Sequence, residues 1–264
     1  MNIVLRELKA NLKSLLIWCG VMILLVFIGA AKFSAFYGDP TMLTMLDAMP
    51  KAMIDAFSLR AFNLTTLVGY QGILFVYFAL MGGIAAALWA SDSISKEERD
   101  KTVEFSLVLP VSRSRVITAK IVAVVIDCII FVAVTWVSSI IAAQQFKPDA
   151  VFSKYLTLQM IAMFVIELIF LAMGLLLGCA MKQYKRAGSL GIAIILVAYF
   201  FSIVTGMQKS LDFLKYFTPF KYFDPVALLK NGTLDGGYLL LSAAIIVVCV
   251  AAAYWSYNRR DLYI

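Results

Sequence analysis

Long apolar segments alternate with short polar ones along the whole chain, and this pattern predicts a bundle of membrane-spanning helices. A helix needs about 20 apolar residues to cross the hydrocarbon core of a bilayer. Several segments reach this length, and the third is long enough to tilt or to extend beyond the hydrocarbon. We predict an all-α integral membrane protein, a single domain over residues 1–264 with six transmembrane helices at about 15–35, 69–91, 117–143, 156–180, 188–207 and 237–257.

Composition supports the membrane class and excludes several others. Hydrophobic residues make up 62% of the chain, charged residues 15%, and the mean hydropathy is +0.90. A soluble domain carries roughly 25% charged and 45–50% apolar residues. The basic residues behind the net charge of +7 are spread over several loops with no continuous basic face, which argues against nucleic-acid binding. Histidine is absent, and with it the commonest general base and metal ligand.

Lysine and arginine are distributed unevenly between the two sets of loops, and this bias predicts the orientation. Fourteen of the 23 lie in the N-terminus, the loop over 92–120, the turn over 181–187 and the C-terminus, and nine lie in the opposite set. We therefore expect both termini and the charged loop over 92–116 to face the cytoplasm. The four cysteines fall within or at the edge of apolar runs, without metal-ligand spacing, and we expect them to be packing residues.

Polar and amphipathic segments outside the spans predict further short helices. The N-terminus places leucines and basic residues on neighbouring helical faces, which is typical of a helix that lies in the membrane interface, although a simple charged flank of the first span fits as well. On the other side we expect short external helices at Leu43–Met49 and Lys51–Phe57. The aromatic and basic stretch over 213–223 is typical of an interfacial belt or of short helices that cap a transport path.

The charged loop also carries apolar residues at helical spacing. Ser95 and Glu98 have the S-x-x-E spacing of a capping box, so we expect a short helix to begin at Lys96. Val103 and Leu107 would form its apolar stripe, and Pro110 would end it. Ser112 can cap the next helix. The loop is predicted to form an amphipathic helix that contacts another protein, and an inert solvated hairpin is the alternative.

At these residues the chain resembles a family, the type-2 ABC transporter permeases. Acidic and basic residues are followed by Thr102-Val103-Glu104, then by Leu109-Pro110-Val111-Ser112-Arg113 and Lys120, as in the first cytoplasmic loop of that family. Arg6-Glu7-Leu8-Lys9 before the first span and the run from Thr218 to Pro225 before the last are also similar. The resemblance covers the whole chain in length, number of spans and placement of loops.

This resemblance implies a partner arrangement. It implies a permease in a bacterial plasma membrane that pairs with a second permease copy or a homologous permease and with two copies of a cytoplasmic ABC ATPase, mostly for export. The first cytoplasmic loop would carry a coupling helix over 96–109 that docks on the ATPase. No G-x-x-x-x-G-K-[ST] motif occurs in the chain, so we expect no cofactor and no catalysis here, with ATP bound by the partner. The candidate coupling residues are Glu97, Glu98, Arg99, Glu104 and Leu107.

Two acidic residues lie inside the predicted spans. A charge at the bilayer centre costs about 2.5–3.5 kcal/mol on insertion scales, so Asp127 and Glu167 are expected to be neutral, paired or next to a wet cavity. They could line a translocation path, or they could hold helices together by hydrogen bonds. Gly174 and Gly178 have the G-x-x-x-G spacing of close helix packing.

Two other functions stay open beside an ATP-driven exporter of an amphipathic small molecule, peptide or lipid. One is an ion-coupled secondary transporter that uses Asp127 and Glu167, although no inverted repeat or broken helix pair is evident. The other is an integral membrane enzyme, against which stands the absence of histidine and of a serine with a base.

Overall fold

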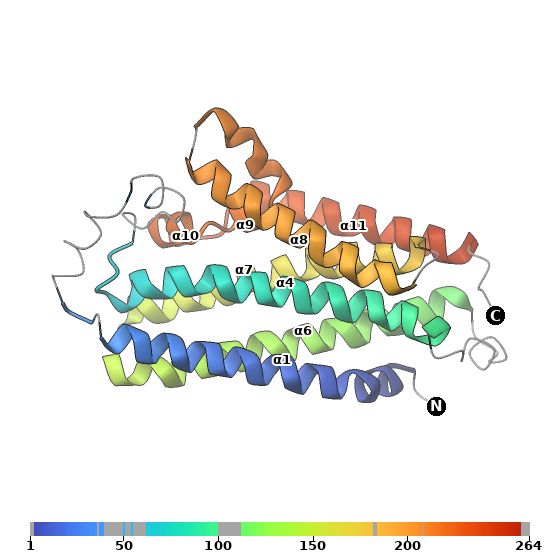
Figure 1. Cartoon of the computed structure of the whole chain (residues 1–264), viewed down its shortest axis with the longest axis horizontal. Coiled ribbons are helices and arrows are strands. Elements are labelled where there is room, and N and C mark those ends of the chain that lie inside the picture. The colour runs from blue at the N-terminus through green and yellow to red at the C-terminus, as the bar shows by residue number, and fades with distance from the viewer. Residues whose placement is uncertain are drawn as a thin grey trace.

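Long helices lie side by side and form the body of the molecule (Figure 1). The computed structural model describes residues 3–35, 37–39, 50, 54, 62–99, 112–181, 184–207 and 209–259. These residues form helices and turns and no strand, which confirms the all-α membrane fold. Among them, six helices are long and apolar enough to cross a membrane: α1 (Ile3–Ser34), α4 (Leu67–Arg99), α6 (Arg113–Ala143), α7 (Ala150–Ala180), α8 (Tyr184–Met207) and α11 (Gly236–Arg259).

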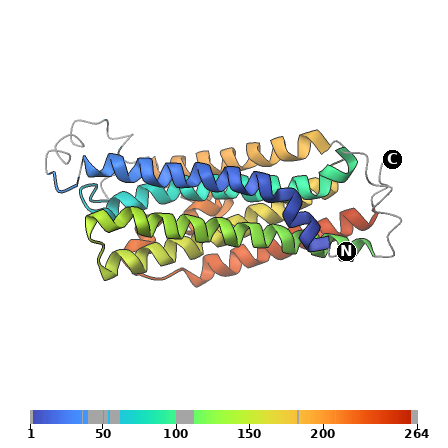
Figure 2. The same ribbon diagram turned by 90° about the horizontal axis from the view of Figure 1, so that it is seen from below.

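The ends of the helices define two ends of the bundle. Helix α1 begins and α11 ends at the same end, which we call the terminal end (Figures 1 and 2). Helix α4 also ends there, and α6 begins there with Ser112 as its N-cap, whose side chain accepts a hydrogen bond from the Arg115 amide. This cap confirms the predicted role of Ser112. At the opposite, far end, α6 runs into the short helix η2 (Gln144–Phe146) and turns into α7.

Helices α4 and α7 make the most extensive contact in the bundle, and glycines on both of them make it close. A Cβ atom added to Gly174 would lie 2.4 Å from the Ala87 carbonyl oxygen, and one added to Gly178 would lie 3.1 Å from the Ser91 carbonyl oxygen. The two backbones approach so closely because neither glycine has a side chain. The packing role predicted from the G-x-x-x-G spacing is therefore confirmed.

The N-terminal residues do not form a separate helix as expected but the first turns of α1, which bend relative to the rest of the helix (Figure 2). Leu5 and Leu12 are exposed, so an apolar face does point outward. Glu7 and Asn11, on the other face, are buried in the bundle. The first turns belong to α1 because these polar side chains find partners on α4 and α6.

Short helices follow α8 at the far end. They are η3 (Lys209–Phe217), α9 (Pro219–Tyr222) and α10 (Pro225–Asn231), and Gly232, at φ +63°, ends the last of them. The predicted aromatic stretch is thus helical, and its aromatic side chains fall into an exposed group and a buried group. Phe213, Tyr216 and Phe217 are exposed, whereas Phe220 and Phe223 are buried. The helices predicted at Leu43–Met49 and Lys51–Phe57 lie outside the described residues, apart from Ile54.

We expect Gly174→Ala to destabilise the bundle, because the new methyl group would meet the backbone of Ala87 rather than a movable side chain. Overpacking of this kind typically costs about 1–3 kcal/mol. We expect a decrease of that size in the free energy of unfolding, measured in mixed micelles. Gly20→Ala on α1 is the control, since nothing lies within 4 Å of its added Cβ. Equal stability of the two variants would contradict the close contact between α4 and α7.

Candidate functional site

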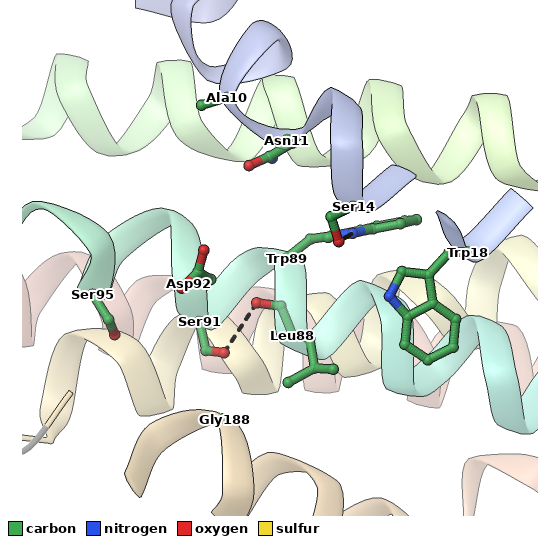
Figure 3. A pocket seen from close by; sticks show the side chains of 10 residues that line it. All are labelled: Ala10, Asn11, Ser14, Trp18, Leu88, Trp89, Ser91, Asp92, Ser95 and Gly188. Atoms are coloured by element: carbon green, nitrogen blue, oxygen red, sulfur yellow. Dashed lines mark hydrogen bonds between the residues drawn. The ribbon is translucent and has the colours of Figure 1, made fainter. Parts of the chain in front are cut away.

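A cleft of 440 Å³ lies on α4 between α1 and α8, towards the terminal end of the bundle (Figure 3). Helix α4 forms its floor, α1 forms one wall, and α8 contributes Gly188 to the other. We call it the α1–α8 cleft. It is lined by two indoles, an aliphatic side chain, hydroxyls, an amide and a carboxylate: Ala10, Asn11, Ser14, Trp18, Leu88, Trp89, Ser91, Asp92, Ser95 and Gly188.

The two tryptophans have different roles in the cleft. The indole N–H of Trp89 donates a hydrogen bond to the Ser14 hydroxyl at 3.0 Å, and its ring packs edge-to-face on Phe131. Trp89 therefore joins α4 to α1 and α6. Trp18 projects from α1 beside Leu88 (Figure 3). The cleft thus combines aromatic surface with hydroxyl, amide and carboxylate groups, which suits an amphipathic ligand.

Charged and amide side chains join three helices beside the cleft. Glu7 on α1 forms an ion pair with Lys96 on α4, and Arg6 also contacts Glu7 at 3.4 Å. The fully buried Lys120 on α6 donates a hydrogen bond to the Ser93 carbonyl on α4. We call this group the polar cluster, and it consists of Glu7, Asn11, Ser93, Lys96, Lys120 and Asp127.

Asp127 belongs to this cluster and not to the cleft lining. Its side chain is fully buried on α6, and its Oδ2 accepts a hydrogen bond of 3.0 Å from Asn11 Nδ2. Asn11 itself lines the cleft. Asp127 therefore lies one side chain behind the cleft wall, where it holds α1 against α6.

Glu167 lies deeper in the bundle, on α7. It is fully buried, and its polar neighbour is the thiol of Cys128 on α6. A Cβ atom added to Gly82 of α4 would lie 2.5 Å from the Glu167 Oε1 atom. The carboxyl group therefore packs directly against this glycine. Neither Glu167 nor Asp127 lines the α1–α8 cleft. A direct role for these two residues in transport stays a prediction.

The predicted coupling residues lie only partly within the described chain. Glu97, Glu98 and Arg99 form the last turn of α4, while Glu104 and Leu107 lie outside the described residues. The prediction that a helix begins at Lys96 is wrong, because α4 continues through this position without a break. Ser95 has helical backbone and is 6% exposed. An N-cap residue needs a non-helical backbone, so the S-x-x-E spacing here is a coincidence inside a helix.

Sequence reasoning missed the residues that line the cleft, although a signal for them exists. Glu7, Asn11, Ser14 and Trp18 are spaced by four, three and four residues, which places them on one face of a helix. Polar residues at that spacing in the first turns of a span indicate a face that packs against protein rather than lipid. Their partners on α4 and α6 are distant in sequence, and no local pattern identifies them.

We expect the Glu7–Lys96 ion pair to appear as a coupling energy in a double-mutant cycle. Glu7→Gln and Lys96→Met should each destabilise the protein, because each leaves a buried charge without its partner, at a cost of about 3–5 kcal/mol. The double variant should lose less than the sum of the two, by about 0.5–3 kcal/mol. The measurement is chemical unfolding of the four proteins in mixed micelles. Additive effects would mean that the pair does not stabilise the bundle.

Comparison with known proteins assigns the chain to a family. No curated protein matches it. The sequence model of the ABC-2 family transporter proteins matches residues 1–262, which is nearly the whole chain. This match agrees with the six spanning helices and with the resemblance noted in the sequence. The chain therefore belongs to the ABC-2 transporter family and is a membrane permease subunit of an ABC transporter.

Proposed function

We propose that this permease subunit works in an ATP-driven exporter and that α4 transmits movement of the ATPase to the α1–α8 cleft. The observation that carries the proposal is the continuity of α4. One unbroken helix bears Leu88, Trp89 and Asp92 in the cleft and ends with Glu97, Glu98 and Arg99. A displacement of its last turn by a bound ATPase would therefore move the floor of the cleft.

The polar cluster extends this coupling to the wall of the cleft. Lys96 lies in the turn of α4 next to the candidate ATPase contacts, and it is paired with Glu7 on α1. Ser14 and Trp18, further along α1, line the cleft. The ion pair gives α1 and α4 a common attachment point, so we expect the wall and the floor to move together.

The proposed assembly contains two permeases and two copies of the ATPase. Outward-facing apolar side chains on α1 and α8, among them Leu16, Leu24, Leu196 and Phe200, offer surface for a second permease copy or a homologous permease, as well as for lipid. The proposed cargo is an amphipathic small molecule, peptide or lipid, in line with the mixed lining of the cleft. Family membership favours this function over an ion-coupled transporter or a membrane enzyme.

We expect the terminal end to be cytoplasmic in a bacterial plasma membrane. In a background without native cysteines, Ser114→Cys at the terminal end and Gln144→Cys at the far end should react with an impermeant maleimide from opposite sides. Both positions are exposed and outside the bundle core. Spheroplasts should label position 144 and inverted vesicles position 114. The reverse pattern would place the ATPase-facing loop on the wrong side and would contradict the proposed orientation.

The double substitution Glu97→Lys with Glu98→Lys should weaken ATPase association or uncouple ATP hydrolysis from transport. Charges at the edge of an interface set on-rate and specificity more than affinity, so we expect a salt-dependent loss of association. Co-purification of the ATPase and substrate-stimulated hydrolysis in proteoliposomes measure the two effects. Membrane insertion should be unaffected because these residues end the helix beyond its apolar part.

The matched control adds two positive charges at exposed positions of the other end of the bundle, Gln144→Lys with Gln145→Lys, and should leave ATPase association unchanged. If the Glu97 and Glu98 variant binds the ATPase and transports like the wild type, the end of α4 is not the coupling element. If the control loses association to the same extent, the effect comes from general destabilisation.

A further inference from the structure

A second groove opens at the far end of the bundle, away from the α1–α8 cleft. It has a volume of 390 Å³ and lies between the start of α7 and the short helix α10. The Tyr155 hydroxyl donates a hydrogen bond of 2.8 Å to the Pro225 carbonyl and holds the two helices together at the base of the groove. The groove has apolar walls from Val151, Leu158, Leu228 and Leu229, and a single charged lining residue, Lys154.

The order of these side chains matches the polarity of one bilayer leaflet. Helix α7 begins at Ala150, so Lys154 lies about one turn inside the far end and Leu158 about one turn deeper. A phospholipid beside α7 has the same order, with a phosphate near the surface and acyl chains further in. The groove therefore offers a cation at headgroup depth and apolar contacts below it.

The charges around the groove favour an anion. Lys154 Nζ lies against Gly232, 3.4 Å from the position of an added Cβ atom, and it has no ion-pair partner among the described residues. Lys230 follows the lining residue Leu229 and is exposed. The neighbouring acids keep their charge but are held at helix N-termini, where Asp149 accepts a hydrogen bond from the Phe152 amide and Asp235 accepts one from the Gly237 amide, and neither forms an ion pair with Lys154.

We propose that this groove is a binding site for an anionic phospholipid of the adjacent leaflet. The phosphate contacts Lys154, with Lys230 beside it, and an acyl chain lies along Val151, Leu158 and Leu228. The bound lipid fills the space between α7 and α10 and stabilises the packing of α10 on the bundle. The site does not depend on the direction of transport or on the ATPase.

The test measures lipid bound to the purified, delipidated full chain in mild detergent by native mass spectrometry. Phosphatidylglycerol should bind in preference to phosphatidylcholine. Lys154→Gln should weaken phosphatidylglycerol binding about fivefold, and Lys154→Gln with Lys230→Gln about 25-fold, from the contribution of one lysine near an anionic headgroup. Lys32→Gln, an exposed lysine at the same end on α1, is the matched control and should bind like the wild type.

A second variant separates a lipid from a free anion. Val151→Asn removes apolar contact from an exposed position, with little risk to folding. It should weaken phosphatidylglycerol binding, and inorganic phosphate should not compete with the lipid at comparable concentration. Competition by phosphate, together with unchanged lipid binding in Val151→Asn, would show an anion site without lipid recognition and would overturn the proposal. Equal binding by wild type, Lys154→Gln and Lys32→Gln would overturn it as well.

Discussion

The close contact between α4 and α7 determines where the other helices can lie. Gly174 and Gly178 allow the backbones to approach at Ala87 and Ser91, and Gly82 on α4 leaves room for the Glu167 side chain. Helix α7 is buried by α4 on one side and by α11 on another. Helices α1 and α8 then contact α4 on separate faces, and the surface between them is left open as the cleft. The cleft thus depends on a glycine-mediated contact, and Ser91 belongs to both the contact and the cleft lining.

Polar residues within the spans fall into two groups with different surroundings. One group joins helices at the terminal end, where Glu7 pairs with Lys96 and Asn11 donates a hydrogen bond to Asp127, across three helices. The other lies along α7, where the polar neighbours of the fully buried Gln159 and Glu167 are the Tyr155 hydroxyl and the Cys128 thiol. Burial of a carboxyl group beside neutral groups alone is costly, so the second group is the less expected one.

Hydropathy alone predicted the spanning helices, because a bilayer requires an apolar stretch of a certain length whatever the tertiary contacts. It underestimated the lengths of α1 and α4, since the first turns of α1 and the last turns of α4 lie at the terminal end, are polar and are held by partners from other helices. Ser112 was identified as a cap from local sequence, because its hydrogen bond is local. The same kind of reasoning failed at Ser95, where S-x-x-E spacing occurs inside a helix. The part of the cleft lining on α1 follows a spacing visible in the sequence, but the part on α4 and α8 could not be predicted, because it depends on which faces of the helices meet.

The uninterrupted course of α4 has a consequence for changes in chain length. Each residue added to or removed from an α-helix turns everything beyond it by about 100°. A single insertion between Ser95 and Lys96 would turn Glu97 and Glu98 by this angle while the cleft stayed in place. It would also separate Lys96 from Glu7. We therefore expect length variation among relatives of this chain to be absent from the last two turns of α4.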